Sequence, residues 1–272
     1  DYLEATLVQA LVQQDVHTAA KLCLQVGRVY GFQRDSAEKH LFQCIYYAEQ
    51  AADLDIQAQA LQRLAQIAAE VGDFPVARTY ADRVLEIVAE DSPVRGSCYL
   101  IRGLIALREA NWDAAIDWYQ RSWQIQKGIG QLRLVAQAEG YLGVAYRYAK
   151  QYDNAVEHLN HSLQLMNTLD SPLQYATLQM ELGITYWYLE RYEDALAVYA
   201  QCEPVFLKSG AKLILAHLYN NRGLALRDLD RIEEARNSFL VSIEMMRELG
   251  LSLWVANAME SLGGLYQRVG NL

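Results

Sequence analysis

Few residues in this chain have the types and the spacing that a catalytic, metal-binding or phosphate-binding site needs. His158 and His161 stand three positions apart, which places two imidazoles on one face of a helix, as in some zinc sites. The residues around them match no zinc-protease motif, so we expect both histidines on the convex surface of a second helix. Residues 127–130, Lys-Gly-Ile-Gly, are too short for a phosphate-binding loop. The sequence therefore predicts no catalytic residues, no metal site and no cofactor, and we expect a protein that is not an enzyme.

The composition of the chain excludes two further classes of protein. The 272 residues carry a formal net charge of −9, whereas nucleic-acid-binding surfaces concentrate Lys and Arg, so we expect no direct nucleic-acid ligand. No apolar run is long enough to cross a bilayer, so we expect no membrane span. The four cysteines form no CxxC pair and stand mostly at small-residue positions. We expect buried, reduced thiols and a cytoplasmic protein.

A spacing of small and large residues recurs along the chain, with a step of 40 residues between the glycines at 143, 183 and 223. Each copy holds a small residue in one predicted helix and an alanine in the next, with large residues between them. The clearest copy contains Leu182, Gly183, Tyr186, Tyr192, Ala195, Tyr199 and Cys202. Small residues let two helices approach closely, and large ones fill the spaces that remain. The pattern predicts antiparallel helix pairs stacked in a solenoid.

This pattern resembles the tetratricopeptide repeat. The resemblance implies an all-α, right-handed superhelical solenoid of antiparallel helix pairs, with about 14 helices. The long period is similar to that of bacterial STAND ATPases and transcriptional regulators, kinesin light chains and LGN-type adaptors. Such families imply a module that binds proteins or senses an inducer.

The repeats predict one domain over residues 1–272. A partial repeat at 1–14 precedes complete repeats at about 17–54, 55–92, 93–131, 132–171, 172–211 and 212–251, and a partial repeat at 252–272 follows. The two partial units suggest a fragment of a longer protein. The apolar face of the last helix, residues 252–270, would lack a partner, so we expect self-association through it.

In this fold the first helix of each pair lines the concave face, which predicts a ligand groove of aromatic, Arg and Asn side chains, the composition of a binding hot spot. Asn220 and Asn221 resemble the asparagines that grip a peptide backbone in long-repeat relatives. The groove residues we expect are Arg108, Tyr141, Arg147, Tyr148, Met180, Glu181, Ile184, Trp187, Tyr188, His217, Asn220, Asn221, Leu224 and Arg227.

Two alternatives stay open for these side chains. The rings of Tyr148, Trp187 and Tyr188 either contact a ligand or pack against the next repeat. Arg102 and Arg222, which precede their glycines, either reach into the groove for a carboxylate ligand or pair with an acid of an adjacent repeat.

Two functions fit a solenoid with such a groove. The first is a non-catalytic interaction scaffold that binds a peptide or protein segment in its concave groove; the partner could also be the remainder of its own chain. The alternative is the inducer- or signal-sensing arm of a multidomain bacterial STAND ATPase or transcriptional regulator. Fold alone does not separate the two.

Overall fold

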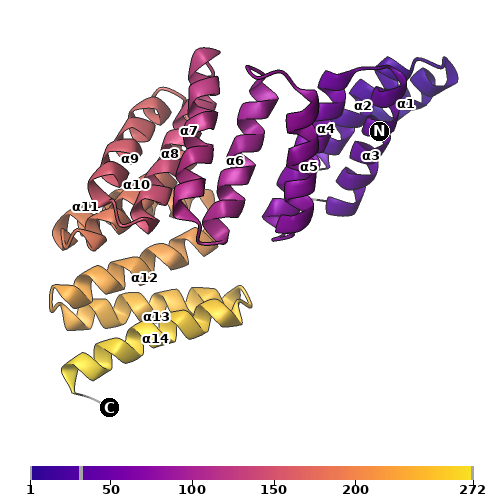
Figure 1. Ribbon diagram of the computed structural model, residues 1–272. Coiled ribbons are helices and arrows are strands. Elements are labelled where there is room, and N and C mark those ends of the chain that lie inside the picture. The colour runs from indigo at the N-terminus through magenta and orange to yellow at the C-terminus, as the bar shows by residue number, and fades with distance from the viewer. Residues whose placement is uncertain (1, 31–32, 271–272) are drawn as a thin grey trace. The chain divides into compact units, whose positions relative to one another are not determined.

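The computed structural model describes residues 2–30 and 33–270, and within these ranges the chain forms 14 α-helices and no strand (Figure 1). This confirms the all-α prediction and the number of helices. The helices are α1 (Tyr2–Val12), α2 (Val16–Val29), α3 (Arg34–Gln50), α4 (Leu54–Glu70), α5 (Phe74–Ile87), α6 (Pro93–Arg108), α7 (Trp112–Gly128), α8 (Leu132–Tyr148), α9 (Tyr152–Asn167), α10 (Pro172–Tyr188), α11 (Tyr192–Ser209), α12 (Lys212–Asp228), α13 (Ile232–Glu248) and α14 (Ser252–Val269).

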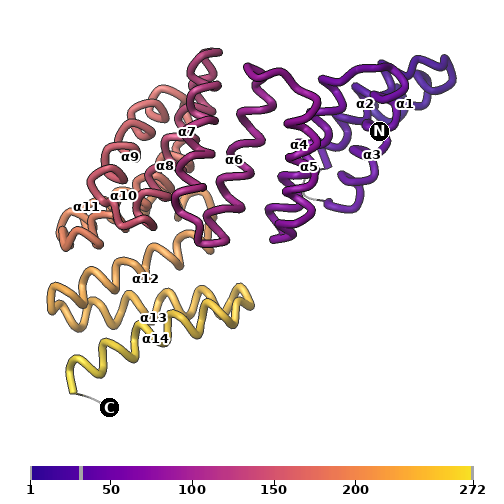
Figure 2. Tube along the Cα trace, in the orientation of Figure 1, coloured from indigo at the N-terminus to yellow at the C-terminus, as the bar shows by residue number. Residues whose placement is uncertain are grey.

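From α1 to α7, and again from α9 to α14, helices that follow one another in the sequence lie side by side as antiparallel hairpins, as the chain trace shows for α12 and α13 (Figure 2). Side chains at the helix starts fix several of these boundaries. Asp53, Asp73 and Asn111 each accept a hydrogen bond from the backbone N–H three residues later, which satisfies a donor that the first helical turn leaves free. Short, capped connections therefore return the chain at once onto the helix before it.

The chain divides into two compact units, residues 1–138 and 139–272, with the division inside α8. The core of the first unit contains Leu41, Leu61 and Leu64. The second unit buries Phe206 against α10 and α12, and Phe239 with Leu226 further along. The single domain over residues 1–272 stays a prediction.

The glycines of the repeat lie where two helices touch. A Cβ atom added to Gly183 would come within 2.5 Å of Cε1 of Tyr199, and one added to Gly223 within 2.6 Å of Cε1 of Phe239. Gly143 meets Leu159 in the same way, at 2.5 Å. Gly263 differs, because nothing lies within 4 Å of such an atom. The close approach that the spacing predicts is thus present in these pairs and absent at Gly263.

The turns inside five helix pairs, from α4–α5 to α12–α13, share one backbone feature, a residue in the left-handed region. Gly72 has a φ of 83° in the turn between α4 and α5. The later pairs place other residue types there, namely Ala110 (57°), Lys150 (61°), Glu190 (60°) and Asp230 (57°). The same turn is therefore built four times without the glycine that it favours.

All four cysteines are buried free thiols, as predicted. Burial raises the pKa of Cys23 to about 11 and that of Cys98 and Cys202 to about 12, so these side chains stay protonated and act as small apolar groups. Among the described helices, none is both long and apolar enough to span a membrane.

Candidate functional site

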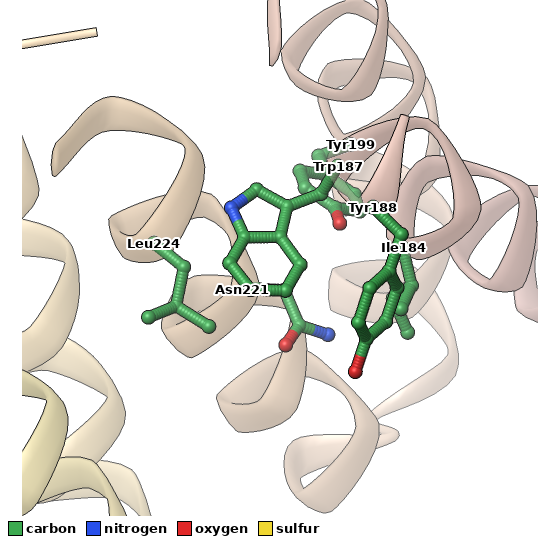
Figure 3. Close-up of a pocket in the computed structure, with 6 residues that line it drawn as sticks. All are labelled: Ile184, Trp187, Tyr188, Tyr199, Asn221 and Leu224. Atoms are coloured by element: carbon green, nitrogen blue, oxygen red, sulfur yellow. The ribbon is translucent and has the colours of Figure 1, made fainter. Parts of the chain in front are cut away.

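The second unit gathers predicted groove residues around one pocket. Its walls come from α10, α11 and α12, and its volume is about 90 Å³ (Figure 3). We call it the groove pocket; it is lined by Ile184, Trp187, Tyr188, Tyr199, Asn221 and Leu224. Five of these six were expected to face a ligand, and the spacing of the repeat had placed them on two successive first helices.

Trp187 and Tyr188 form the aromatic wall of the groove pocket. Their ring centroids are 4.9 Å apart at an interplanar angle of 71°, an edge-to-face contact. Tyr188 also stacks on Tyr152 of α9 at 5.5 Å, yet remains 44% exposed. Trp187 Nε1 donates a hydrogen bond of 2.9 Å to Asp228 of α12. Trp187 therefore packs against the next repeat, whereas Tyr188 keeps an open surface.

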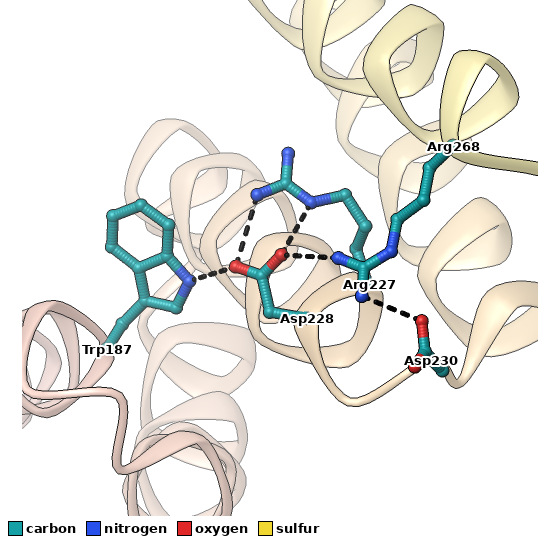
Figure 4. A network of polar contacts seen from close by, with 5 residues as sticks. All are labelled: Trp187, Arg227, Asp228, Asp230 and Arg268. Carbon is teal, nitrogen blue, oxygen red and sulfur yellow. Dashed lines mark hydrogen bonds and ion pairs between the residues drawn. The ribbon is translucent and has the colours of Figure 1, made fainter.

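Asp228 is the centre of a polar network at the end of α12 (Figure 4). Arg227 donates to its carboxylate through Nε at 2.9 Å and through Nη2 at 3.1 Å. Arg268 of α14 donates to the same carboxylate at 3.3 Å and pairs with Asp230 at 2.8 Å. The Asp228 side chain is only 14% exposed, so charged partners compensate for its lost hydration. The guanidinium of Arg227 is therefore already engaged within the protein.

A second bridge links α8 to α10. Nη2 of Arg147 lies 2.7 Å from Glu181 Oε2, and the two side chains are 8% and 24% exposed. The Arg147 guanidinium also lies over the rings of Tyr148 and Tyr188, at 4.9 and 5.9 Å from their centroids. Its Nε is buried and has no hydrogen-bond partner in the protein. Arg147 and Trp187 both stand four residues after a repeat glycine, so equivalent positions join successive repeats.

Tyr199 is the residue that sequence reasoning missed, because its aromatic ring was assigned to filling space. The residue is 1% exposed, lines the groove pocket, and its hydroxyl has no hydrogen-bond partner in the protein. Burial raises the pKa of Tyr199 far above its usual range, and the negative charge of Glu181 adds to this effect. The signal that could have revealed it is Phe239, which fills the equivalent position without a hydroxyl.

Other predicted groove residues lie elsewhere. Met180 is 7% exposed and belongs to the core around Phe206, so it packs between helices and does not line the pocket. Arg108 is exposed at the end of α6 and belongs to the first unit. Tyr141 is half-buried on α8.

Two further predicted groove residues, His217 and Asn220, face α14 and the interior, respectively. The rings of His217 and Trp254 form an edge-to-face contact with their centroids 4.6 Å apart, and burial lowers the pKa of His217. Asn220 is half-buried, and its side-chain oxygen has no partner within the protein. Of the Asn pair, only Asn221 lines the groove pocket.

Arg102 and Arg222 both pair with an acid of an adjacent repeat, which is the second of the two alternatives that the sequence left open. Arg102 Nη1 lies 3.0 Å from Asp82 of α5, and Arg222 Nη1 lies 3.4 Å from Glu203 of α11. Each arginine thus pairs with an acid of the preceding repeat. Neither is left for a carboxylate ligand.

The prediction for His158 was wrong. It is not a plain surface residue, because its Nδ1 lies 2.5 Å from Oε2 of Glu139, which is 5% exposed. Tyr146 stacks on its ring at 5.0 Å, while His161 is exposed. The register of α9 turns His158 toward α8. No cluster of three possible metal ligands occurs in the described part of the chain.

Comparison with known proteins agrees with this architecture. A family model for the tetratricopeptide repeat matches residues 134–208, and a second with the same description matches residues 215–249. No curated protein matches the sequence.

Solved structures extend the likeness to nearly the whole chain. The STAND protein with a tetratricopeptide repeat sensor from Pyrococcus horikoshii superposes with a TM-score of 0.72 at 14% identity, over 96% of this chain and 42% of that protein. The apo quorum sensor NprR from B. thuringiensis superposes with a TM-score of 0.68 at 15% identity, over 96% of this chain and 73% of that protein. A Rap protein complexed with competence and sporulation factor superposes with a TM-score of 0.65 at 13% identity, over 94% of this chain and 76% of that protein. At these identities the likeness shows the fold.

Proposed function

The chain is a tetratricopeptide-repeat protein, and from this premise we propose that it is a non-catalytic scaffold that binds a peptide or protein segment along α8, α10 and α12. Its repeats support an interaction scaffold in general. The free, buried thiols support a reducing compartment such as the cytoplasm.

The groove pocket carries this proposal. Two successive first helices contribute apolar walls, two aromatic rings and one carboxamide to a single concavity. Binding sites commonly combine a mostly apolar lining with a few placed polar groups. Tyr188, which is half-open and braced by Tyr152, has the features of an aromatic anchor at an interface.

The polar bridges along the same helices favour binding over catalysis. Arg147, Trp187 and Arg227 are held by Glu181 and Asp228, so the polar groups beside the pocket position other side chains. A surface held in this way is preorganised, which lowers the ordering cost of binding. The proposed partner is therefore a polypeptide segment that inserts a side chain between α10 and α12.

The test is capture from a lysate of the source cells on the immobilised protein. The groove variant combines Tyr188→Ser with Asn221→Ala, which leaves both bridges intact. The matched control is Leu240→Ser, which removes a side chain that is 45% exposed on the second helix α13. We expect a polypeptide that binds the wild type and the control and is lost from the groove variant, followed by calorimetry with that purified partner. Equal retention by the groove variant would contradict the proposal.

The second candidate is the sensing arm of a multidomain bacterial STAND ATPase or regulator that binds an inducer or a signal. The fold shared with a STAND sensor and with a quorum sensor supports it. A small molecule or short peptide in the eluate, lost from the same groove variant, would favour this function over the scaffold.

Self-association through α14 is a separate proposal. Leu253, Trp254 and Met259 are 72%, 42% and 50% exposed on that helix. We expect the sedimentation coefficient to rise with protein concentration, and Leu253→Lys to abolish the rise. A wild-type protein that stays monomeric at all concentrations would contradict self-association.

A further inference from the structure

Basic and acidic residues are divided unequally between the two kinds of helix. The first helices of the pairs, which are the even-numbered helices α2 to α14, contain 12 Lys and Arg residues and 6 Asp and Glu residues. The second helices, which are the odd-numbered helices α1 to α13, contain 9 and 17. The first helices therefore carry a net charge of +6 and the second helices a net charge of −8, in a chain whose net charge is −9.

Residue spacing shows which side chains of the first helices share a face, because an α-helix turns by about 100° per residue. The reference is the repeat position that lies against the second helix, namely Gly27 in α2, Ala65 in α4 and Gly103 in α6. A Cβ atom added to Gly27 would meet Leu41 of α3 at 2.9 Å, and one added to Gly103 would meet Tyr119 of α7 at 2.3 Å. Side chains about 100–160° from this position therefore point away from the second helix.

Four basic residues of the first unit lie on that face. Lys21 and Arg28 stand six positions before and one after the reference in α2, Arg63 two before it in α4, and Arg108 five after it in α6. Helix α4 contacts both α2 and α6, so the four side chains belong to one continuous surface, which we call the basic surface. Its one acidic residue is Glu70, five positions after the reference in α4 and 4.0 Å from Arg63.

The charges of the basic surface are mostly not neutralised within the protein. Lys21 and Arg108 are exposed, and neither makes an ion pair or a side-chain hydrogen bond with any residue in the ranges that the structure describes. Arg28 is also exposed, and its Nη2 donates a hydrogen bond of 2.8 Å to the neutral Gln59 of α4. Three cations are thus held on one surface without an acidic partner.

The same face of the first helices in the second unit has a different character. Its charged residues are Glu181, Asp228 and Arg268, and the last two pair with each other at 3.3 Å. Tyr148 and Tyr188 are 46% and 44% exposed there. The excess of basic residues is therefore a property of the first unit and does not follow from the repeat pattern itself.

The surroundings of the basic surface limit the kind of partner. Residues 1–138 contain 13 Lys and Arg residues and 17 Asp and Glu residues, so outside the basic surface this unit has 9 basic and 16 acidic residues. A nucleic acid carries a charge on every nucleotide and would extend onto this acidic surrounding. A short acidic segment would end with the basic surface, because exposed charges act over only about 8 Å at physiological ionic strength.

We propose that the basic surface binds an acidic segment of a polypeptide, whose Glu and Asp side chains pair with Lys21, Arg28, Arg63 and Arg108. Complementary charge of this kind steers association and selects among partners. The inference rests on the proposed function in that the partner is a polypeptide, but it concerns a surface that contains no residue of the groove pocket.

The probe is fluorescein-labelled octaglutamate, and its anisotropy is followed as the full chain is added. We expect saturable binding that weakens as the salt concentration rises from about 0.01 to about 0.15 M, because the Debye length shortens from about 30 to about 8 Å. The double variant Arg28→Gln with Arg108→Gln should weaken binding roughly two- to thirtyfold, the effect of two exposed ion pairs. Both side chains are exposed, so this variant should fold.

The matched control is Arg83→Gln with Arg121→Gln, which removes the same charge from two second helices, where these side chains are 48% and 52% exposed. It should bind octaglutamate more tightly than the first double variant does, and octaglutamine and a single-stranded octathymidylate should bind the wild type more weakly than octaglutamate.

Three results would overturn the basic surface: no saturable binding of octaglutamate, equal affinities of the two double variants, or binding of octaglutamine or the oligonucleotide that is as tight as that of octaglutamate. The groove variant, Tyr188→Ser with Asn221→Ala, should bind octaglutamate as the wild type does. Its loss of the captured partner would still support the scaffold in each of those cases, so the two proposals fail separately.

Discussion

Replacing Gly183 by alanine should lower the stability of the protein, whereas the same change at Gly263 should raise it. Both glycines occupy the same position of the repeat in the middle of a first helix. Alanine is favoured over glycine inside a helix by about 1 kcal/mol. At Gly263 nothing lies within 4 Å of the new methyl group, so this gain should be observed.

At Gly183 the methyl group would meet the ring of Tyr199, with contacts of 2.5, 3.0 and 3.1 Å. The ring is 1% exposed, so it can relieve these contacts only by shifting toward the groove pocket and the side chains that line it. Overpacking of this kind costs about 1–3 kcal/mol. After the helix-propensity gain of about 1 kcal/mol, Gly183→Ala should be destabilising by up to roughly 2 kcal/mol.

The measurement is urea unfolding followed by far-UV circular dichroism, with amide exchange in α10 and α14 to resolve local effects, since a repeat array need not unfold in one step. The control is the double variant Gly183→Ala with Tyr199→Ala. Relative to Tyr199→Ala alone, it should be stabilised, because the obstructing ring is gone. Equal effects of alanine at Gly183 and Gly263 would refute the packing argument.

Three further predictions concern the polar groups of the second unit. Asp228→Asn should lower the free energy of unfolding by about 1–3 kcal/mol, because the partly buried carboxylate holds two guanidinium groups, and Trp187 fluorescence should change; an unchanged urea midpoint would contradict this. Tyr199→Phe should leave stability equal or raise it by up to about 1–2 kcal/mol, since the hydroxyl has no partner, and a clear loss of stability would show that it has one. Burial lowers the pKa of His217 from 6.5, so the unfolded protein binds a proton at this residue more readily than the folded protein. The stability that His217 contributes above about pH 6.5 should therefore be lost as the pH falls through its folded pKa. His217→Gln should flatten this part of the plot of unfolding free energy against pH, and identical plots for variant and wild type would contradict the prediction.

The fold could be predicted from the sequence because packing in this array depends on side-chain size at fixed intervals. Gly183 and Tyr199, or Gly223 and Phe239, stand sixteen residues apart in each pair, and this spacing alone indicates which residues meet. Five of the six residues of the groove pocket followed from the same register.

The polar part of the site could not be predicted in the same way. Periodicity places Trp187 and Arg147 on a helix face, but whether they bind a ligand or a neighbouring repeat depends on distances of 2.9 and 2.7 Å to Asp228 and Glu181. Those distances arise from side-chain rotamers and helix spacing, on which a residue pattern carries no information. Met180 shows the same limit, because a small rotation of α10 decides between surface and core.

The left-handed turns are positions at which the stability of the protein could be raised. Ala110, Lys150 and Glu190 adopt φ angles of 57°, 61° and 60°, which cost an L-residue roughly 1–2 kcal/mol compared with glycine. Each turn belongs to its own helix pair, so the costs should add with little coupling. None of the three residues lines the groove pocket. The array could therefore be made more heat-resistant one turn at a time, and its thermal tolerance and its choice of ligand could evolve independently.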